Sequence, residues 1–264
     1  MNKVWIMVRK EWSEVFRNRI VFFTVLFMPL IMAVIPLMML FSTRGVTDMS
    51  ALDEFGVAFE QMRSACGPLN DIECVQFLLL QQFMSLFLLL PVLIPVTIAA
   101  YSIVGEKTTH TLEPLLATPI TTAQLLAGKA LAAAIPAVLA TLLSFSIFAV
   151  GTAFLAVSPQ VALRLFSPIW MLGIFVVGPL LSIAGVSLAV MISSRVNDPR
   201  VADQISALVV LPVMALFFGQ MLGFVAVNAN LMIVIALVMA GVDAALLFFA
   251  TRLFQREVIL TRWK

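Results

Sequence analysis

The chain has 264 residues, of which 62% are hydrophobic and 11% charged, and its mean hydropathy is +1.10. A chain this apolar cannot hide its hydrophobic surface inside one soluble core, so the composition excludes an ordinary soluble protein. It predicts an all-α integral membrane protein. The formal net charge of +2 comes without a basic patch interleaved with aromatic residues, which gives no support for nucleic-acid binding.

Residues 1–19 predict an amphipathic helix on the cytoplasmic membrane surface. Over residues 3–18, most charged side chains fall opposite one apolar helical face. That face is formed by Val4, Trp5, Val8, Trp12, Val15 and Phe16. The pattern is typical of a topogenic anchor resting on an anionic leaflet, and it also allows contact with a partner protein.

Residues 20–264 predict a six-helix transmembrane domain, because a membrane-spanning helix needs about 20 mostly apolar residues. The expected spans are 20–41, 82–104, 130–157, 168–193, 205–227 and 231–251. Thirteen of the sixteen lysines and arginines fall in the two tails and in the loops 105–129 and 194–204. The positive-inside rule therefore predicts a multi-pass protein of the cell inner membrane with both termini in the cytoplasm.

The polar segment 42–81 is expected outside the cytoplasm, where it either caps a transport path or connects two spans. It contains both cysteines of the chain, Cys66 and Cys74. In an oxidising compartment, two cysteines eight positions apart can form a disulfide. A metal site is not expected, because the segment has no histidine and no second pair of cysteines.

Five of the expected spans contain proline, which permits hinges but is also widely tolerated in membrane helices. The prolines are Pro29, Pro36, Pro91, Pro95, Pro136, Pro179 and Pro212. Small residues form a stripe in the fourth span and a G-x-x-x-G pattern at Gly219 and Gly223 in the fifth. Both patterns are suited to close helix packing, within one subunit or at a homodimer seam.

Two polar side chains inside expected spans are candidates for a translocation path. Asp243 is the only acid inside a span, and a charged side chain near the middle of a membrane costs about 2.5 to 3.5 kcal/mol. It contacts a cation or proton, or it packs neutral against a hydroxyl or amide. Gln220 is the second candidate.

Residues 105–126 form a charged segment between the second and third spans that membrane insertion alone does not require. Thr108 or Thr109 can cap a short helix here, with Glu113 near its first turn. Leu112, Leu115 and Leu116 then fall on one side. Such a helix is suited to a groove on a soluble partner, although an ordinary interfacial loop helix has the same pattern.

The sequence of this segment resembles the first cytoplasmic loop of type-2 ABC transporter permeases. The resemblance rests on Glu106, Thr111-Leu112-Glu113, Leu115-Leu116, Thr118-Pro119 and Gly128-Lys129, and on a similar tail at 253–260. His110 departs from the family, where glycine is common. The resemblance implies a coupling helix that contacts an ATPase through Glu106, Thr111, Leu112, Glu113, Leu115, Leu116 and Pro119. Arg195 and Arg200, in the loop 194–204, are the expected second contact.

The resemblance further implies an exporter built from two membrane subunits and two separate ATPase subunits. We expect the second membrane subunit to be a copy of this chain. The sequence has no G-x-x-x-x-G-K-[ST] motif, so ATP and Mg²⁺ would be bound by the ATPases, and this chain is expected to bind no cofactor or metal. It also has no H-E-x-x-H or G-x-S-x-G motif, so the chain itself is not expected to be an enzyme.

Two other functions fit the same composition. A secondary transporter would be driven by an ion gradient through Asp243. A membrane-embedded scaffold or sensor would transport nothing.

Overall fold

The computed structural model describes residues 3–44, 63, 66–108, 120–193, 196 and 198–253. Within these ranges the regular structure is helical and contains no strand. Six helical stretches are long and apolar enough to cross a membrane. The predicted all-α membrane fold is therefore confirmed.

The helices follow one another along the chain with short connections. Their bounds are α1 Lys3–Val15, α2 Arg19–Thr43, α5 Asp71–Phe87, α6 Leu90–Thr108, α8 Thr122–Leu155, α9 Pro159–Arg164, α10 Pro168–Leu172, the π-helix η1 Gly173–Val177, α11 Gly178–Ser193, α12 Pro199–Ser206, the 3₁₀-helix η2 Ala207–Val210, α13 Leu211–Met221 and α14 Ala229–Leu253. The six span-length stretches are Val21–Thr43, Asp71–Ala100, Gln124–Leu155, Pro159–Ser193, Gln204–Met221 and Ala229–Ala250.

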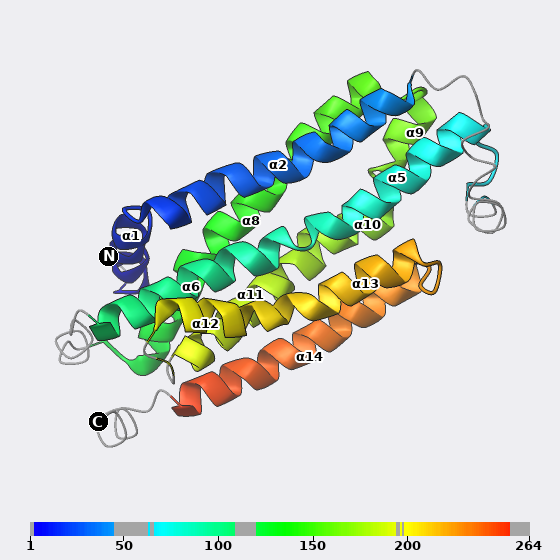
Figure 1. Ribbon diagram of the computed structural model, residues 1–264. Helices are drawn as coiled ribbons and strands as arrows, with labels where there is room; N and C mark the ends of the chain where they lie inside the picture. Colours follow the sequence, from blue (N-terminus) through cyan, green and yellow to red (C-terminus); the bar gives the residue numbers. More distant parts are fainter. Residues whose placement is uncertain are drawn as a thin grey trace.

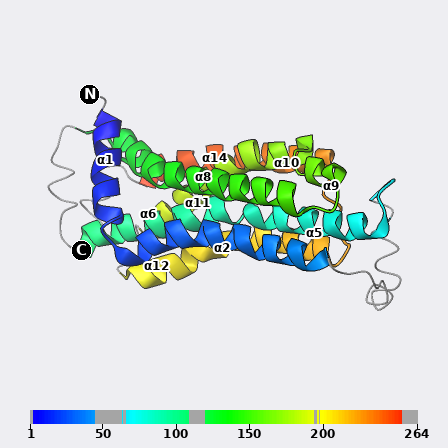
Figure 2. The same ribbon diagram turned by 90° about the horizontal axis from the view of Figure 1, so that it is seen from above.

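The long helices run side by side as an elongated bundle, and α1 lies across one end of it (Figures 1 and 2). We call this the α1 end and the opposite one the α9 end. The last turn of α14 also lies at the α1 end (Figure 1). Helix α2 also begins at the α1 end, so the first span starts and the sixth span ends at the same end of the bundle (Figure 1).

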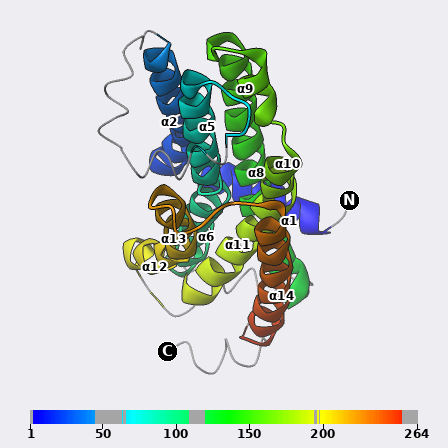
Figure 3. The ribbon, with the colours of Figure 1, turned by 90° about the vertical axis from the view of Figure 1, so that its right-hand side faces the viewer.

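The centre of the bundle is the second span, Asp71–Ala100, whose most apolar window is 78% buried by protein. Helix α11 packs closely against it. A Cβ atom added at Gly185 would lie 3.2 Å from Val96 Cγ2, so the small residue permits this approach. The fifth and sixth spans lie at the edge, with only 11% of each window buried, and Figure 3 shows α12–α14 on the side opposite α2 and α9.

Three spans begin earlier than expected, and the fourth, Pro159–Ser193, does so because α9 precedes α10. The other two begin at capped turns. The second begins at Asp71, where Asn70 and Glu73 form a capping box, so residues 71–81 of the expected extracytoplasmic segment are helical. The third begins at Thr122, which is capped by Thr121 and Gln124. Hydropathy misses these ends because a capped first turn is polar while its backbone is already helical.

The fifth span ends earlier than expected, at Met221 instead of residue 227. Gly223 adopts a φ of +75°, and the N–H of Phe224 donates to the Gly219 carbonyl while that of Gly223 donates to Gln220. These are the two hydrogen bonds of a Schellman motif. The interpretation of Gly219 and Gly223 as a helix-packing pattern was therefore wrong, since Gly223 ends the helix.

Local irregularities accompany several prolines. The second span breaks at Leu88–Leu89, just before Pro91; the π-helix η1 precedes Pro179, and η2 precedes Pro212. Pro95 has no N–H to offer the carbonyl of Pro91, four residues earlier. The Ser182 hydroxyl of α11 donates to that carbonyl over 2.8 Å, so a neighbouring helix satisfies it.

At the α9 end, polar contacts join the ends of several spans. Gln76 Nε2 donates to Thr43 Oγ1 over 3.0 Å, and its Oε1 accepts from the Val157 N–H over 2.8 Å. Cys66 and Cys74 form a disulfide, with their Cα atoms 5.4 Å apart. Both sulfur-bearing side chains are buried in a small cluster with Leu69, and an ion pair joins Arg63 to Asp71.

Candidate functional site

The candidate site is at the α1 end, where α1 lies on the helices that flank the segment 105–126. The helix packs on α8 and touches α6, and its packed face contains Met7, Val8, Glu11 and Val15. Trp5 remains 49% exposed although it belongs to the predicted apolar face. The face of α1 that packs on the rest of the protein thus includes a carboxylate, that of Glu11.

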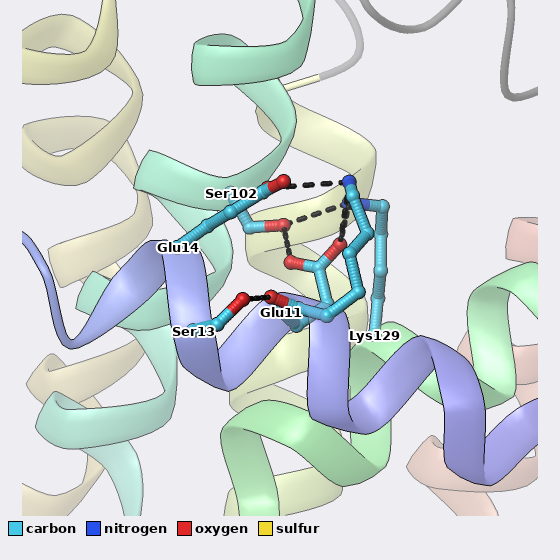
Figure 4. A network of polar contacts seen from close by, with 6 residues as sticks. Glu11, Ser13, Glu14, Ser102 and Lys129 are labelled. Carbon is cyan, nitrogen blue, oxygen red and sulfur yellow. Dashed lines mark hydrogen bonds and ion pairs between the residues drawn. The ribbon is translucent and has the colours of Figure 1, made fainter.

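A buried ion pair fastens α1 to α8 (Figure 4). Lys129 Nζ donates to Glu11 Oε1 over 2.9 Å, and the two side chains are 5% and 2% exposed. Ser102 of α6 completes the network, because its Oγ accepts from Lys129 Nζ over 2.7 Å and donates to Glu11 Oε2. Three helices thus meet at one carboxylate.

The electrostatic balance keeps Glu11 ionised. Burial by itself raises the pKa of this carboxyl, but the Lys129 ammonium, the hydrogen bonds from Ser102 and Lys129, and the charge of Lys10 together hold the pKa below its usual value. A buried charge pair is tolerated only when its hydrogen bonds are made, as they are here.

Two further contacts hold α1 against α8 on either side of Lys129. Gly128 lets Met7 approach so closely that an added Cβ would lie 2.8 Å from the Met7 Cβ. Trp12 Nε1 donates to the carbonyl of Ala132 over 2.9 Å. The first turns of α8 are therefore covered by α1 over one continuous stretch.

Most of the predicted ATPase contacts are outside the described residues. This holds for Thr111, Leu112, Glu113, Leu115, Leu116, Pro119 and Arg195. The backbone at Glu106 belongs to α6, so the start of the expected segment is helical. Thr108 lies within α6, and Thr109 lies outside the described residues. The backbone at Arg200 belongs to α12, which packs on α6.

The two translocation-path candidates occupy different environments. Gln220 lies against α5, where its Oε1 accepts from the Ser85 hydroxyl and its Nε2 donates to the Gln81 carbonyl over 3.4 Å. Asp243 in α14 is 5% exposed, and neither carboxylate oxygen has a hydrogen-bond partner among the described residues. The structure does not bring the two side chains into one hydrogen-bond network.

The sequence matches a model of a known protein family. The family model described as "ABC-2 family transporter protein" matches residues 5–257. The chain belongs to the ABC-2 transporter family. No curated protein matches it closely enough to serve as a relative.

This ABC-2 chain is accordingly the membrane-spanning permease subunit of an ABC transporter, a class of permease that associates with ABC ATPase subunits. Within the permease, the sequence analysis missed the roles of Glu11 and Ser102 and placed Lys129 at a loop end. One signal was available, because Glu11 follows Val8 by three positions and precedes Val15 by four, on the same helical stripe. No periodicity in the sequence links Glu11 to its partner Lys129, which lies 118 positions away.

Proposed function

We propose that this permease is half of an ATP-driven exporter and that its segment 105–126 is the docking site for a separate ATPase subunit. In this proposal the ATPase binds and hydrolyses ATP with Mg²⁺, and its movement pushes on the segment. The spans then change between inward and outward access. Both termini and the α1 end lie in the cytoplasm.

The supporting observation is the Glu11–Ser102–Lys129 network. Ser102 lies shortly before the segment and Lys129 shortly after it, so the network joins the two helices from which the segment emerges. A displacement of the segment would act on α6 and α8 together, and α1 would move with them. A loop that merely connects two spans needs no buried charge at its base.

The remaining features of the proposal come from the family and from the charge distribution. Two ATPases imply a second membrane subunit, which we propose is a copy of this chain. Export is the direction that the family resemblance implies. Arg195 and Arg200 provide a second contact for the ATPase.

The test is copurification. Affinity-tagged permease from native membranes should elute with ATP hydrolysis and with an ABC ATPase identified by its peptides. Because this chain has no phosphate-binding motif, such hydrolysis reports the partner. Substituting Leu115→Asp together with Leu116→Asp should abolish both while leaving the permease inserted, since two buried carboxylates would oppose apolar docking.

A matched control is available at the other end of the bundle. Leu163 of α9 is 69% exposed, and Leu163→Asp places one carboxylate far from the proposed docking site. This variant should retain the ATPase. Equal ATPase recovery from the segment variant and the control would contradict the docking role.

A further inference from the structure

Helix α8 contains a proline whose missing N–H affects its contact with α1. Pro136 lies inside the helix and has no N–H, so the carbonyl of Ala132, four residues earlier, has no donor within the helix. The donor comes from Trp12, whose indole Nε1 lies 2.9 Å from that oxygen. A side chain from another helix therefore supplies the hydrogen bond that the proline cannot make.

The two halves of α8 are held by different neighbours. Before Pro136, Gly128 and Lys129 contact Met7 and Glu11 of α1. After Pro136, Ser144 Oγ donates to the Pro29 carbonyl of α2 over 2.6 Å, and Gly151 lies directly against Leu37 of α2. We call residues 122–132 the foot of α8 and residues 137–155 its shaft.

From this arrangement we propose that Trp12 is a positioning residue for a hinge in the third span. Its indole N–H donates to the Ala132 carbonyl that Pro136 leaves without a helical donor, and this hydrogen bond fixes the angle between the foot and the shaft. Proline breaks are the usual points at which membrane helices bend, because the ladder of hydrogen bonds is open there. Closing the gap with an external donor removes that freedom. Withdrawing the donor restores it.

The hinge is distinct from the attachment of α1. Glu11 and Met7 contact the foot without involving the Ala132 carbonyl, so α1 stays attached when the indole donor is lost. The consequence for transport rests on the proposed function, since a load on the segment 105–126 would reach the foot first. The hinge itself can be measured on the permease alone, without any ATPase.

The experiment uses pairs of spin labels on the full chain in lipid nanodiscs. The native cysteines are joined in a disulfide, so introduced cysteines label selectively. Labels at Leu131 and Val150, both exposed and 19 positions apart, span the break and lie about 28 Å from each other at 1.5 Å per residue. Labels at Ser13 and Leu131 report the attachment of α1 through dipolar line broadening.

Trp12→Phe keeps an aromatic ring and removes the donor. It should broaden the Leu131–Val150 distance distribution and leave the Ser13–Leu131 pair unchanged. Adding Pro136→Ala should narrow the first distribution again, because residue 136 then offers its own N–H to Ala132. Trp5→Phe is the matched control, since Trp5 is exposed and lies edge-to-face against Trp12, and it should change neither pair.

Three results would overturn the proposal. An unchanged Leu131–Val150 distribution in Trp12→Phe would mean that the indole does not restrain the break. A change in the Ser13–Leu131 pair would mean that α1 detaches. Persistent broadening in Trp12→Phe/Pro136→Ala would mean that Trp12 acts by packing.

If Trp12→Phe alone yields no folded protein, the double variant must recover the wild-type yield and the wild-type Leu131–Val150 distribution. Its failure to do so counts against the hinge.

Discussion

Glu11 and Lys129 stand 118 positions apart in the chain, yet their Oε1 and Nζ atoms lie 2.9 Å from each other and both side chains are buried. Removing one partner leaves an uncompensated buried charge. Glu11→Gln should therefore lower the free energy of unfolding by about 3–5 kcal/mol. Adding Lys129→Met should recover part of that loss, because the stranded ammonium is gone. Denaturation of the purified permease in detergent micelles measures both changes.

The control for this prediction lies on the same helix. Glu14 pairs with Lys10 over 3.2 Å but is 55% exposed, so Glu14→Gln should change stability by no more than about 1 kcal/mol. If the two glutamine variants behave alike, the ion pair at Glu11 does not hold α1 in place.

The same carboxylate predicts an acid-sensitive attachment of α1. The pKa of Glu11 in the folded protein is below its ordinary value, so its contribution is fully present at neutral pH. The contribution is lost as the pH falls below the ordinary glutamate value of about 4.3 and through the folded pKa. The stability difference between wild type and Glu11→Gln should thus shrink between pH 7 and pH 3. A difference that stays constant over this range would contradict the lowered pKa.

The disulfide Cys66–Cys74 should strengthen the α9 end. A bridge that closes a loop this small stabilises a protein by about 2–3 kcal/mol. Denatured wild type should react with a maleimide only after reduction, whereas Cys66→Ser should react at Cys74 without reductant. Wild type that is modified without reductant would show that the bridge is absent from the protein in its membrane.

Asp243→Asn is expected to affect thermal stability and transport differently. Its carboxylate oxygens are buried without a partner among the described residues, so the neutral isostere in Asp243→Asn should raise the thermal midpoint. If ATP drives transport, the variant should keep ATP-dependent activity. A stable variant with no activity would instead favour the gradient-driven alternative, and transport by wild type would then survive ATP depletion.

Ser182 should behave toward Pro95 as Trp12 does toward Pro136. Ser182→Ala removes the hydroxyl that donates to the Pro91 carbonyl and should cost about 1 kcal/mol. In a Pro95→Ala background the cost should nearly vanish, because residue 95 then supplies an N–H. A thermal-denaturation cycle of the four proteins measures the coupling, and equal losses in both backgrounds would exclude it.

The number and order of the spans were predictable because each is an apolar run long enough to cross a bilayer, a property local to the run. Boundaries at Asp71, Thr122 and Met221 were less accessible. Polar capping residues at the first two decide where a helix begins, and the positive φ of Gly223 after the third decides where a helix ends, without changing the hydropathy. The resemblance of the segment 105–126 to the family was also visible in the sequence, although its predicted contact residues beyond Thr108 lie outside the described residues.

By itself, the sequence determined that this protein is a helical membrane protein with an amphipathic N-terminus, since length, hydropathy and charge bias act residue by residue along the chain; the permease function came from the resemblance to a family. Only the tertiary structure decided that Glu11 meets Lys129 and that Trp12 meets the carbonyl freed by Pro136. The physical reason is that a buried charge or an open carbonyl requires a partner but does not specify which one. The packing of α1 across α8 supplies that choice.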